Sequence, residues 1–309
     1  MNKKAKAWVF VLIVIIILFF FSMLIAGIIS VLFGGDVSAI SGNVAVIPIK
    51  GTIVTEGSPG IFSQDLTSSS KVVGLIERAD KNVNIKAIVF EINSGGGSAV
   101  ASDEIASKIK KIEKPTVSWI REVGASGAYW IASSTDYIIV NRMSITGSIG
   151  VIGSYLQFSG LMSRYNVTYE RLVGGKYKDI GTPFKSLEDK ERELFQKEID
   201  IIHDYFIDEV SQNRNIPRDK IEEIATGLFY TGVQAKELGL VDELGGEDEV
   251  KQYLEKKYNI SVNYVRYEDK PTFLEMLSQA LILPSFYMGK GIGSAFLDRE
   301  VTNTLEVWA

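Results

Sequence analysis

Apolar residues recur with two different periods along the chain. Alternating or short uninterrupted apolar runs, which are typical of strands, occupy residues 43–54, 85–92, 115–121 and 136–141. Apolar residues at helical spacing occupy residues 71–80, 98–112 and 128–136, so that helices and strands follow one another in regular succession. This order predicts an α/β fold in which a mostly parallel sheet is covered by helices.

The second half of the chain is dominated by a long predicted helix. Residues 164–184 indicate one more strand followed by a loop, and residues 186–215 show helical spacing throughout. Ser186 and Asp189 have the spacing of a capping-box variant, which predicts that this helix opens at Ser186. Another helix is expected to begin at Pro217, and a short strand is expected at residues 239–241.

The N-terminus carries a pattern of another kind. Residues 8–33 contain no charged side chain, whereas about 20 apolar residues are enough to span a bilayer. Lysines precede this run and the first charge after it is Asp36, so the positive-inside rule predicts a cytoplasmic N-terminus. A cleavable signal peptide is the alternative, but its apolar core would span only about 7 to 15 residues. We therefore predict a single-pass protein of the cell membrane whose main domain lies outside the cytoplasm.

These patterns divide the 309-residue chain into five parts. The C-terminal stretch is partly apolar, but Pro284 and several glycines interrupt it, so a second membrane span is not expected there. The predicted parts are a cytoplasmic tail at 1–7, a transmembrane anchor at 8–33, a tether at 34–42, one folded domain at 43–265 and a C-terminal extension at 266–309.

Composition narrows the chemistry that this domain can perform. A formal net charge of -5 argues against nucleic acid as a partner, because phosphate backbones are bound by an excess of lysine and arginine. The absence of cysteine excludes a thiol nucleophile, and the scarcity of histidine makes a zinc site or another cofactor unexpected. The one histidine, His203, borders the apolar stripe of the long helix, and we interpret it as a helix-surface residue and not as a catalytic base.

Two glycine-rich turns supply the candidate chemistry. Residues 95–97 follow one predicted strand and residues 124–127 follow the next, and α/β sheets place their sites at these carboxyl ends. Glycine turns let backbone N–H groups point at a developing oxyanion, and Ser126 stands where a nucleophile would be exposed. A dinucleotide site is excluded at the first turn, because Val100 stands where the fingerprint requires glycine.

A nucleophilic serine needs a base, and a buried neutral lysine is the alternative to histidine. Lys176 and Lys178 of the segment GGKYKDIG are both candidates for this base. Their spacing from Ser126 does not choose between them.

Five motifs, in this order, resemble the signal peptide peptidase A family in its short, single-domain type. They are INSGGGSAVASDEI, GASGAYWIASSTDYI, NRMSITGSIGVIG, GGKYKDIGTPF and YTGVQAKELGLVDELGG. The resemblance implies the Clp protease/crotonase-like fold of repeated β-β-α units and a Ser-Lys dyad that works without a cofactor. It implies that Ser126 is the nucleophile and that Lys178, not Lys176, is the general base. Ser148 is implied to orient the lysine.

The resemblance also carries expectations about the oxyanion hole, the assembly and the substrate. Gly96 or Gly97 is implied to donate one N–H to the oxyanion, with Gly127 as a second donor. The family motif has a proline where this chain has Gly95, which we expect to affect loop stability modestly and not to remove the chemistry. A dome-like homo-octamer that completes each dyad across a subunit interface is implied. Its substrates would be remnant signal peptides and other apolar peptides at the outer face of the membrane.

Three other interpretations remain open. A crotonase-like acyl-CoA enzyme would use the same type of oxyanion hole, but acyl-CoA is cytoplasmic and the domain is predicted to lie outside. A catalytically silent membrane scaffold is disfavoured by the joint presence of Ser126, Lys178 and Ser148. A related protease that partners stomatin-like membrane proteins would carry further membrane spans. A membrane-anchored serine endopeptidase is therefore the function that the sequence favours.

Overall fold

A computed structural model describes residues 3–33, 42–57 and 66–268 of the chain. Contacts divide the chain into two units, one comprising Ser41–Glu268 and the other joining Met1–Ile40 to Asp269–Ala309. Most of the predicted tether, at 34–41, and most of the predicted C-terminal extension, at 269–309, lie outside the described residues.

The N-terminal segment forms helix α1 (Lys3–Phe33). The side chains that the structure describes between Leu12 and Ile25 are mostly exposed. Within the described residues, no helix combines the length and the apolar character that crossing a bilayer requires.

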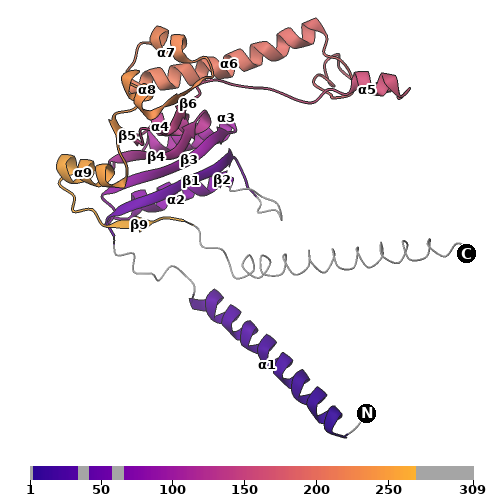
Figure 1. Ribbon diagram of the computed structural model, residues 1–309, viewed down its shortest axis with the longest axis vertical. Helices are drawn as coiled ribbons and strands as arrows, with labels where there is room; N and C mark the ends of the chain where they lie inside the picture. The colour runs from indigo at the N-terminus through magenta and orange to yellow at the C-terminus, as the bar shows by residue number, and fades with distance from the viewer. Residues whose placement is uncertain (1–2, 34–41, 58–65, 269–309) are drawn as a thin grey trace, which may run out of the picture. The chain divides into compact units, whose positions relative to one another are not determined.

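A nine-stranded sheet forms the centre of unit Ser41–Glu268 (Figure 1). Its strands are β1 (Val44–Val54), β2 (Leu66–Ser68), β3 (Ala87–Gly97), β4 (Thr116–Ala125), β5 (Tyr137–Val140), β6 (Ile145–Gly147), β7 (Phe229–Thr231), β8 (Glu243–Leu244) and β9 (Tyr264–Arg266). The order is β2-β1-β3-β4-β5-β8, with β6 beside β4, β7 beside β6 and β9 beside β1. Every pairing is parallel except that of β6 with β7, which confirms the predicted mostly parallel sheet.

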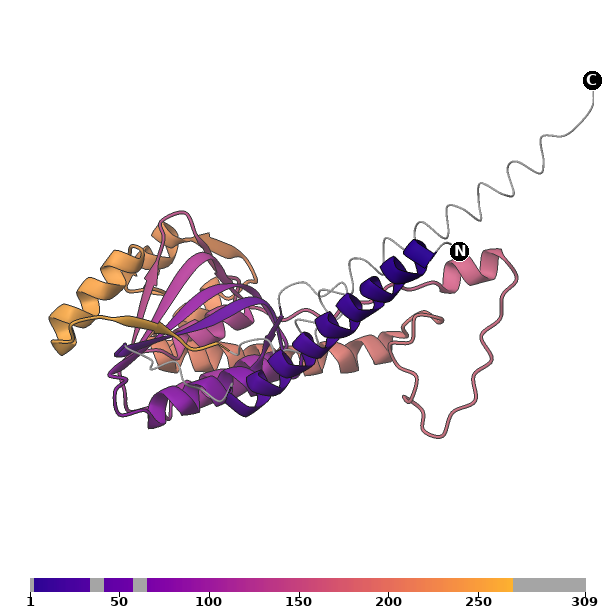
Figure 2. The same ribbon diagram turned by 90° about the horizontal axis from the view of Figure 1, so that it is seen from below.

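Helices cover both faces of this sheet. The helices of unit Ser41–Glu268 are α2 (Ser69–Lys81), α3 (Ala99–Ile109), α4 (Gly127–Ser133), α5 (Ser159–Arg164), α6 (Asp189–Arg214), α7 (Arg218–Ile224), α8 (Gly232–Glu237) and α9 (Glu247–Tyr258). Ile76 of α2, Ile105 of α3 and Tyr129 of α4 are buried in one core with alternate strand residues such as Phe90. On the other face Leu254 of α9 packs in a second core (Figure 2). The predicted helical cover of the sheet is thus confirmed.

The structure differs from the sequence prediction at the end of β3 and in residues 164–184. β3 runs through the first glycine turn, because β1 resumes its pairing with Gly96 and Gly97 after a bulge. The strand expected within 164–184 is absent from the described chain, where these residues pair with no other strand. An isolated strand has no partner for its backbone hydrogen bonds, so an extended sequence pattern alone does not produce one.

Other differences concern α6 and the strand predicted at 239–241. α6 begins at Asp189, and the capping box is formed by Glu188 and Glu191, so the start predicted at Ser186 is wrong. The short strand lies at 243–244, where it pairs with β5. His203 is half-buried on α6, and its Nε2 atom is buried without a hydrogen-bond partner among the described residues, so it is not a plain surface residue.

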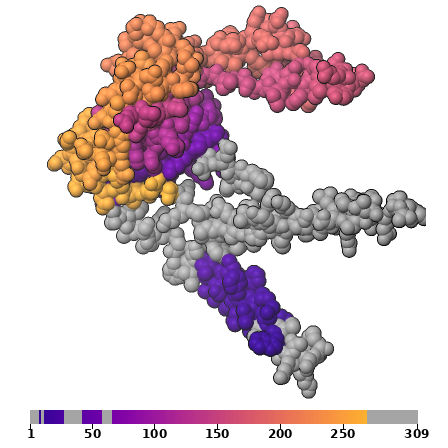
Figure 3. Space-filling model, in the orientation of Figure 1, coloured from indigo at the N-terminus to yellow at the C-terminus, as the bar shows by residue number. Residues whose placement is uncertain are grey.

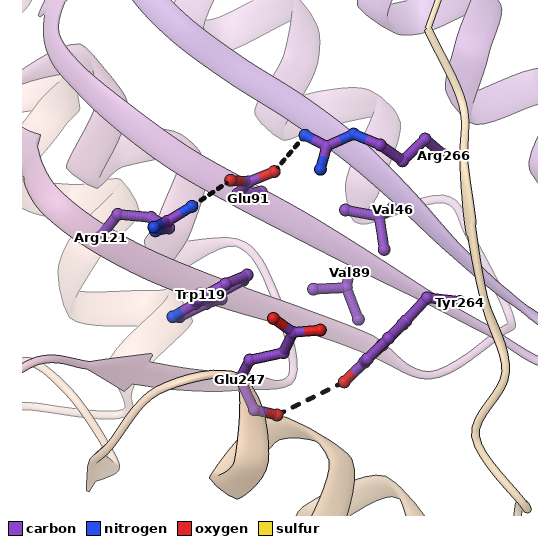
Figure 4. Close-up of a pocket in the computed structure, with 8 residues that line it drawn as sticks. All are labelled: Val46, Val89, Glu91, Trp119, Arg121, Glu247, Tyr264 and Arg266. Carbon is purple, nitrogen blue, oxygen red and sulfur yellow. Dashed lines mark hydrogen bonds and ion pairs between the residues drawn. The ribbon is translucent and has the colours of Figure 1, made fainter.

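A buried carboxylate, Glu91 of β3, ties several strands together on the α9 side of the sheet. The side chain is 2% exposed and accepts hydrogen bonds from Arg121 (2.7 Å) on β4 and from Arg266 on β9. The Lys50 ammonium of β1 lies 3.9 Å away. Figure 4 shows the two guanidinium groups on either side of this carboxylate, at a cavity of about 120 Å³ whose lining includes Trp119. Ion pairs from three neighbouring strands therefore converge on Glu91.

These contacts determine the protonation of Glu91. Burial raises the pKa of Glu91, but the hydrogen bond from Arg121 and the positive charges of Arg266 and Lys50 outweigh burial and hold the pKa below its usual value. A carboxyl whose pKa is depressed on folding stabilises the folded state above the unfolded pKa, near 4.3, and this contribution is lost as pH falls through the folded pKa.

We expect Glu91→Gln to lower the free energy of unfolding by about 2 kcal/mol at pH 7, because three cations lose their charged partner. The difference from the unmodified protein should shrink as the pH falls below about 4. Denaturant unfolding of the full chain at several pH values measures this. Glu122→Gln, at an exposed carboxylate of the neighbouring strand β4, is the matched control. Equal stability of the two variants at every pH would contradict the role of Glu91.

Candidate active site

Ser126 joins the end of β4 to the start of α4. Its backbone angles are φ 54° and ψ -128°, a conformation that a residue with a side chain adopts only where its surroundings impose it. The N–H of Ser126 donates to the carbonyl of Gly147 on β6 (2.8 Å). The Ser126 carbonyl accepts from the N–H groups of Tyr129 (2.9 Å) and Trp130 (3.0 Å). The sheet and the helix together therefore fix the turn.

Backbone conformation singles out two serines in the described part of the chain. Among the non-glycine residues there, positive φ occurs at three asparagines, which tolerate it, and at Ser126 and Ser148. Ser148, with φ 50°, directly follows β6. Strained residues concentrate at functional sites, so the backbone gives independent support to both serines.

Ser148 lies beside the Ser126 turn. Ala125 at the end of β4 pairs with Gly147 at the end of β6, so Ser126 and Ser148 each follow one member of a paired couple. The Ser148 N–H donates to the carbonyl of Leu228 (3.0 Å), and its hydroxyl donates to the carbonyl of Gly227 (3.1 Å). The structure thus brings the two predicted serines to the same end of the sheet.

The glycine end of β3 packs directly against the Ser126 turn. Gly96 has φ 97°, and a Cβ atom placed on it would lie 2.7 Å from the nitrogen of Gly127 and 3.0 Å from Cβ of Ser126. A Cβ atom on Gly97 would lie 2.1 Å from the carbonyl oxygen of Ile53 on β1. Both positions therefore require glycine for close approach, Gly96 to the Ser126 turn and Gly97 to the neighbouring strand.

Ser94 organises this glycine end, and it was not among the residues predicted to form the site. The N–H of Gly96 donates to the Ser94 hydroxyl oxygen (3.0 Å), and that hydroxyl donates to the carbonyl of Gly51 on β1 (2.6 Å). Ser94 is 2% exposed, so both hydrogen bonds are shielded from water. The bridge restrains a loop that lacks a proline at Gly95. A hydroxyl residue just before a glycine turn was the sequence signal, because serine commonly bonds to nearby backbone there.

The hydrogen bonds of Ser94 also indicate which of the candidate oxyanion donors are available. Because the Gly96 N–H is already engaged, Gly97 and Gly127 are the better placed donors. The N–H of Ser98 donates to Ile53 of β1 (2.8 Å), and successive N–H groups of an extended strand point to opposite sides, so that of Gly97 points away from β1. A Cβ atom on Gly127 would lie 3.4 Å from the Gly97 nitrogen, which places the two groups side by side.

Lys178 lies in a different region, which we call the arm and define as residues 151–188. The arm contains α5, and with the first part of α6 it stands out from the sheet and its helices (Figures 1 and 3). The Lys178 side chain is exposed, and the ammonium of Lys176 lies over the Tyr177 ring (5.1 Å). Within one chain, neither lysine is brought to the strand ends that carry Ser126 and Ser148.

The contact of Gly127 with α3 gives a test of the donor assignment. A Cβ atom on Gly127 would lie 2.3 Å from the Ser102 hydroxyl oxygen, whereas its φ is not positive, so this collision is the main obstacle to alanine. We expect Gly127→Ala to lower the rate of peptide hydrolysis by about 100-fold through displacement of its N–H. Adding Ser102→Gly should restore most of the rate.

Gly97→Ala is the matched comparison, because it meets backbone and no side-chain substitution can relieve the clash. Hydrolysis rates are compared on variants whose unfolding midpoints have been measured. A folded Gly127→Ala protein with an unchanged rate, or a double variant without recovery, would contradict the assignment.

Comparison with known proteins agrees with this geometry. Residues 108–261 match peptidase family S49, and this span contains Ser126, Ser148 and Lys178. A Methanocaldococcus jannaschii protein provisionally named a protease is 34% identical over 250 residues, which are 79% of this chain and 79% of the relative. An Enterococcus faecium protein provisionally named signal peptide peptidase SppA is 30% identical over 234 residues, 74% of this chain and 68% of the relative.

A third relative is a longer protein than this chain. The chloroplastic serine protease SPPA of Arabidopsis thaliana is 30% identical over 274 residues, 88% of this chain but 39% of the relative. From the matched domain and the extent of these likenesses, the chain belongs to the signal peptide peptidase A family within peptidase family S49, and it is a serine protease.

Proposed function

We propose that this serine protease is an endopeptidase with a Ser-Lys dyad, in which Ser126 is the nucleophile and Lys178 the general base. The observation that carries the proposal is the strained Ser126 turn packed against the glycine end of β3. That packing puts a hydroxyl nucleophile beside backbone N–H groups, which is the arrangement that acyl transfer needs.

The dyad would work by covalent catalysis. The neutral amine of Lys178 removes the proton of the Ser126 hydroxyl as its oxygen attacks the scissile carbonyl. The N–H groups of Gly97 and Gly127 stabilise the oxyanion of the tetrahedral intermediate. Collapse expels the amine of the leaving peptide, which takes the proton from Lys178, and leaves an acyl group on Ser126. Water, deprotonated by the same lysine, then hydrolyses this ester, and Ser148 orients the lysine through its hydroxyl.

The location of Lys178 supports a dyad that is completed between subunits. One chain holds Ser126 at the end of the sheet and Lys178 on the arm, so the arm of a second copy is the natural source of the base. Large apolar side chains on the arm are exposed in the single chain, among them Ile152 (86%) and Leu172 (96%). Exposed apolar surface on this scale is typical of a surface that associates. We propose a closed homo-oligomer, with a dome-like octamer as its form.

We further propose that residues 8–33 anchor the protease in the cell membrane, with the catalytic domain on the outer side. The uncharged run in the sequence, the lysines before it and the helical conformation of α1 support an anchor. An anchored, externally facing protease would meet apolar peptides at the bilayer surface. Remnant signal peptides are the substrates that we propose, within the Clp protease/crotonase-like type of fold.

Substitution of either dyad residue tests the mechanism. We expect Ser126→Ala and Lys178→Ala each to abolish cleavage of an apolar peptide without preventing assembly, and Lys178→Arg to fail because a guanidinium does not become neutral near pH 7. Lys176→Ala is the matched control on the same turn and should keep most of the activity. Wild-type turnover by purified Lys178→Ala would show that another group is the base.

Mixing the two inactive variants tests whether the dyad forms between subunits. Random co-assembly of Ser126→Ala and Lys178→Ala chains should recover about a quarter of wild-type activity, because an intact serine then meets an intact lysine at about one interface in four. Activity is measured after the detergent-solubilised oligomers have been dissociated and reassembled together. Co-assembly without any recovery would instead indicate a dyad within one chain.

A further inference from the structure

Four charged side chains form a continuous chain of ion pairs around the turn that carries Lys178. We propose that Arg171 and Asp179 are positioning residues of this protease, in which Arg171 closes the Lys178 turn and keeps the neighbouring Asp179 carboxylate from pairing with Lys178. The inference rests on the proposed function, in which Lys178 is the general base.

Arg171 and Asp179 make a bidentate contact. Nε of Arg171 lies 2.6 Å from Oδ2 of Asp179, and Nη2 lies 2.8 Å from Oδ1. The same Nη2 atom donates to the backbone carbonyl of Lys176 (2.7 Å). A planar guanidinium that meets both carboxylate oxygens at once fixes their orientation as well as their position. Arg171 therefore closes a loop from residue 171 to residue 179 with Lys178 near its end.

Backbone turns complete the fixation of Lys178. Its N–H donates to the carbonyl of Gly175 (3.2 Å), and the N–H of Ile180 donates to the carbonyl of Tyr177 (3.2 Å). Gly175 has φ 106°, a conformation that glycine adopts without strain. The Lys178 backbone is thus held from both sides, which leaves its side chain to reach out from the arm.

The ion pairs continue to the start of α6. The ammonium of Lys185 lies 3.5 Å from Asp179 and 2.6 Å from Glu191. Glu191 is 2% exposed and accepts from the N–H of Glu188 in the capping box of α6. The Lys178 turn is in this way connected to the end of a long helix, which makes the arm a defined support for the base.

The charges explain why Asp179 needs Arg171. Hydrogen bonds from Arg171, together with the charges of Arg171 and Lys185, outweigh burial and hold the pKa of Asp179 at about 2. Asp179 is therefore a carboxylate near neutral pH. It follows Lys178 in the sequence, and a free carboxylate there would favour the protonated ammonium over the neutral amine that catalysis requires. Arg171 occupies both of its oxygens.

Other ionisable groups also lie near this turn. Glu191 is engaged by Lys185, and Lys176 lies over the Tyr177 ring. The Tyr169 hydroxyl contributes to the electrostatic surroundings of Arg171. Among these neighbours, Asp179 is the acid adjacent to Lys178 in the chain, so it is the group whose release should matter most.

The test is the pH dependence of kcat/KM for an apolar peptide, measured on the full chain. Arg171→Gln should move the acid limb of the profile to higher pH by about one unit, which is about a tenfold loss of kcat/KM at a fixed pH on that limb. Arg171→Gln combined with Asp179→Asn should return the limb to its wild-type position, although kcat stays reduced because the loop is no longer closed. Arg164→Gln, at an exposed arginine of α5, is the matched control and should leave the profile in place.

The limb position distinguishes this role from a structural one. Partial unfolding or incomplete assembly lowers the amplitude of the profile but does not move its midpoint along the pH axis. An unmoved limb in Arg171→Gln, or a shift that persists in the double variant, would overturn the inference. If Lys178→Ala is active, the proposed dyad itself fails. If Lys178→Ala is inactive and Arg171→Gln matches Arg164→Gln, only the positioning role is lost.

Discussion

The close approach of the glycine end of β3 to the Ser126 turn is the constraint on which the site depends. A side chain at Gly96 would collide with the Gly127 nitrogen and with Ser126, so the two segments can approach only because this residue has no Cβ. The parallel pairing of β4 with β3 and β6 brings the two segments to the same end of the strands. The strain at Ser126 persists because hydrogen bonds from the sheet and α4 fix it from both directions.

Lys178, the proposed general base, lies in a part of the chain that is stabilised by different interactions. The sheet and the helices packed on it are stabilised by two apolar cores, whereas the Lys178 turn is stabilised by ion pairs and backbone turns. In the proposed mechanism, a nucleophile on the sheet and a base on the exposed arm would form a working pair when one subunit meets another. Assembly would then control activity.

Much of the sheet and its covering helices could be predicted from the sequence, because these strands and helices follow the short-range spacing of apolar residues. Ser126 was a candidate because of its turn, and Ser148 was a candidate because of the family motif. The extent of β3 was not predictable, since the pairing of Gly97 depends on a bulge in a strand distant in sequence. The strand predicted within 164–184 does not form, because no neighbouring strand in the described part of the chain pairs with these residues. The contact of Arg171 with Asp179 was not predictable either, because a turn of the chain brings these residues together and the spacing of apolar residues does not indicate it.

The central claim is that Ser126 and Lys178 form one catalytic pair, with the lysine supplied by a second subunit. A structure of the assembled protein with a peptide inhibitor bound covalently to Ser126 measures this most directly. We expect the Lys178 Nζ atom of a neighbouring subunit to lie about 2.6 to 3.2 Å from the Ser126 oxygen, within hydrogen-bond reach. A different basic group at that distance, or Lys178 of the same chain, would contradict it.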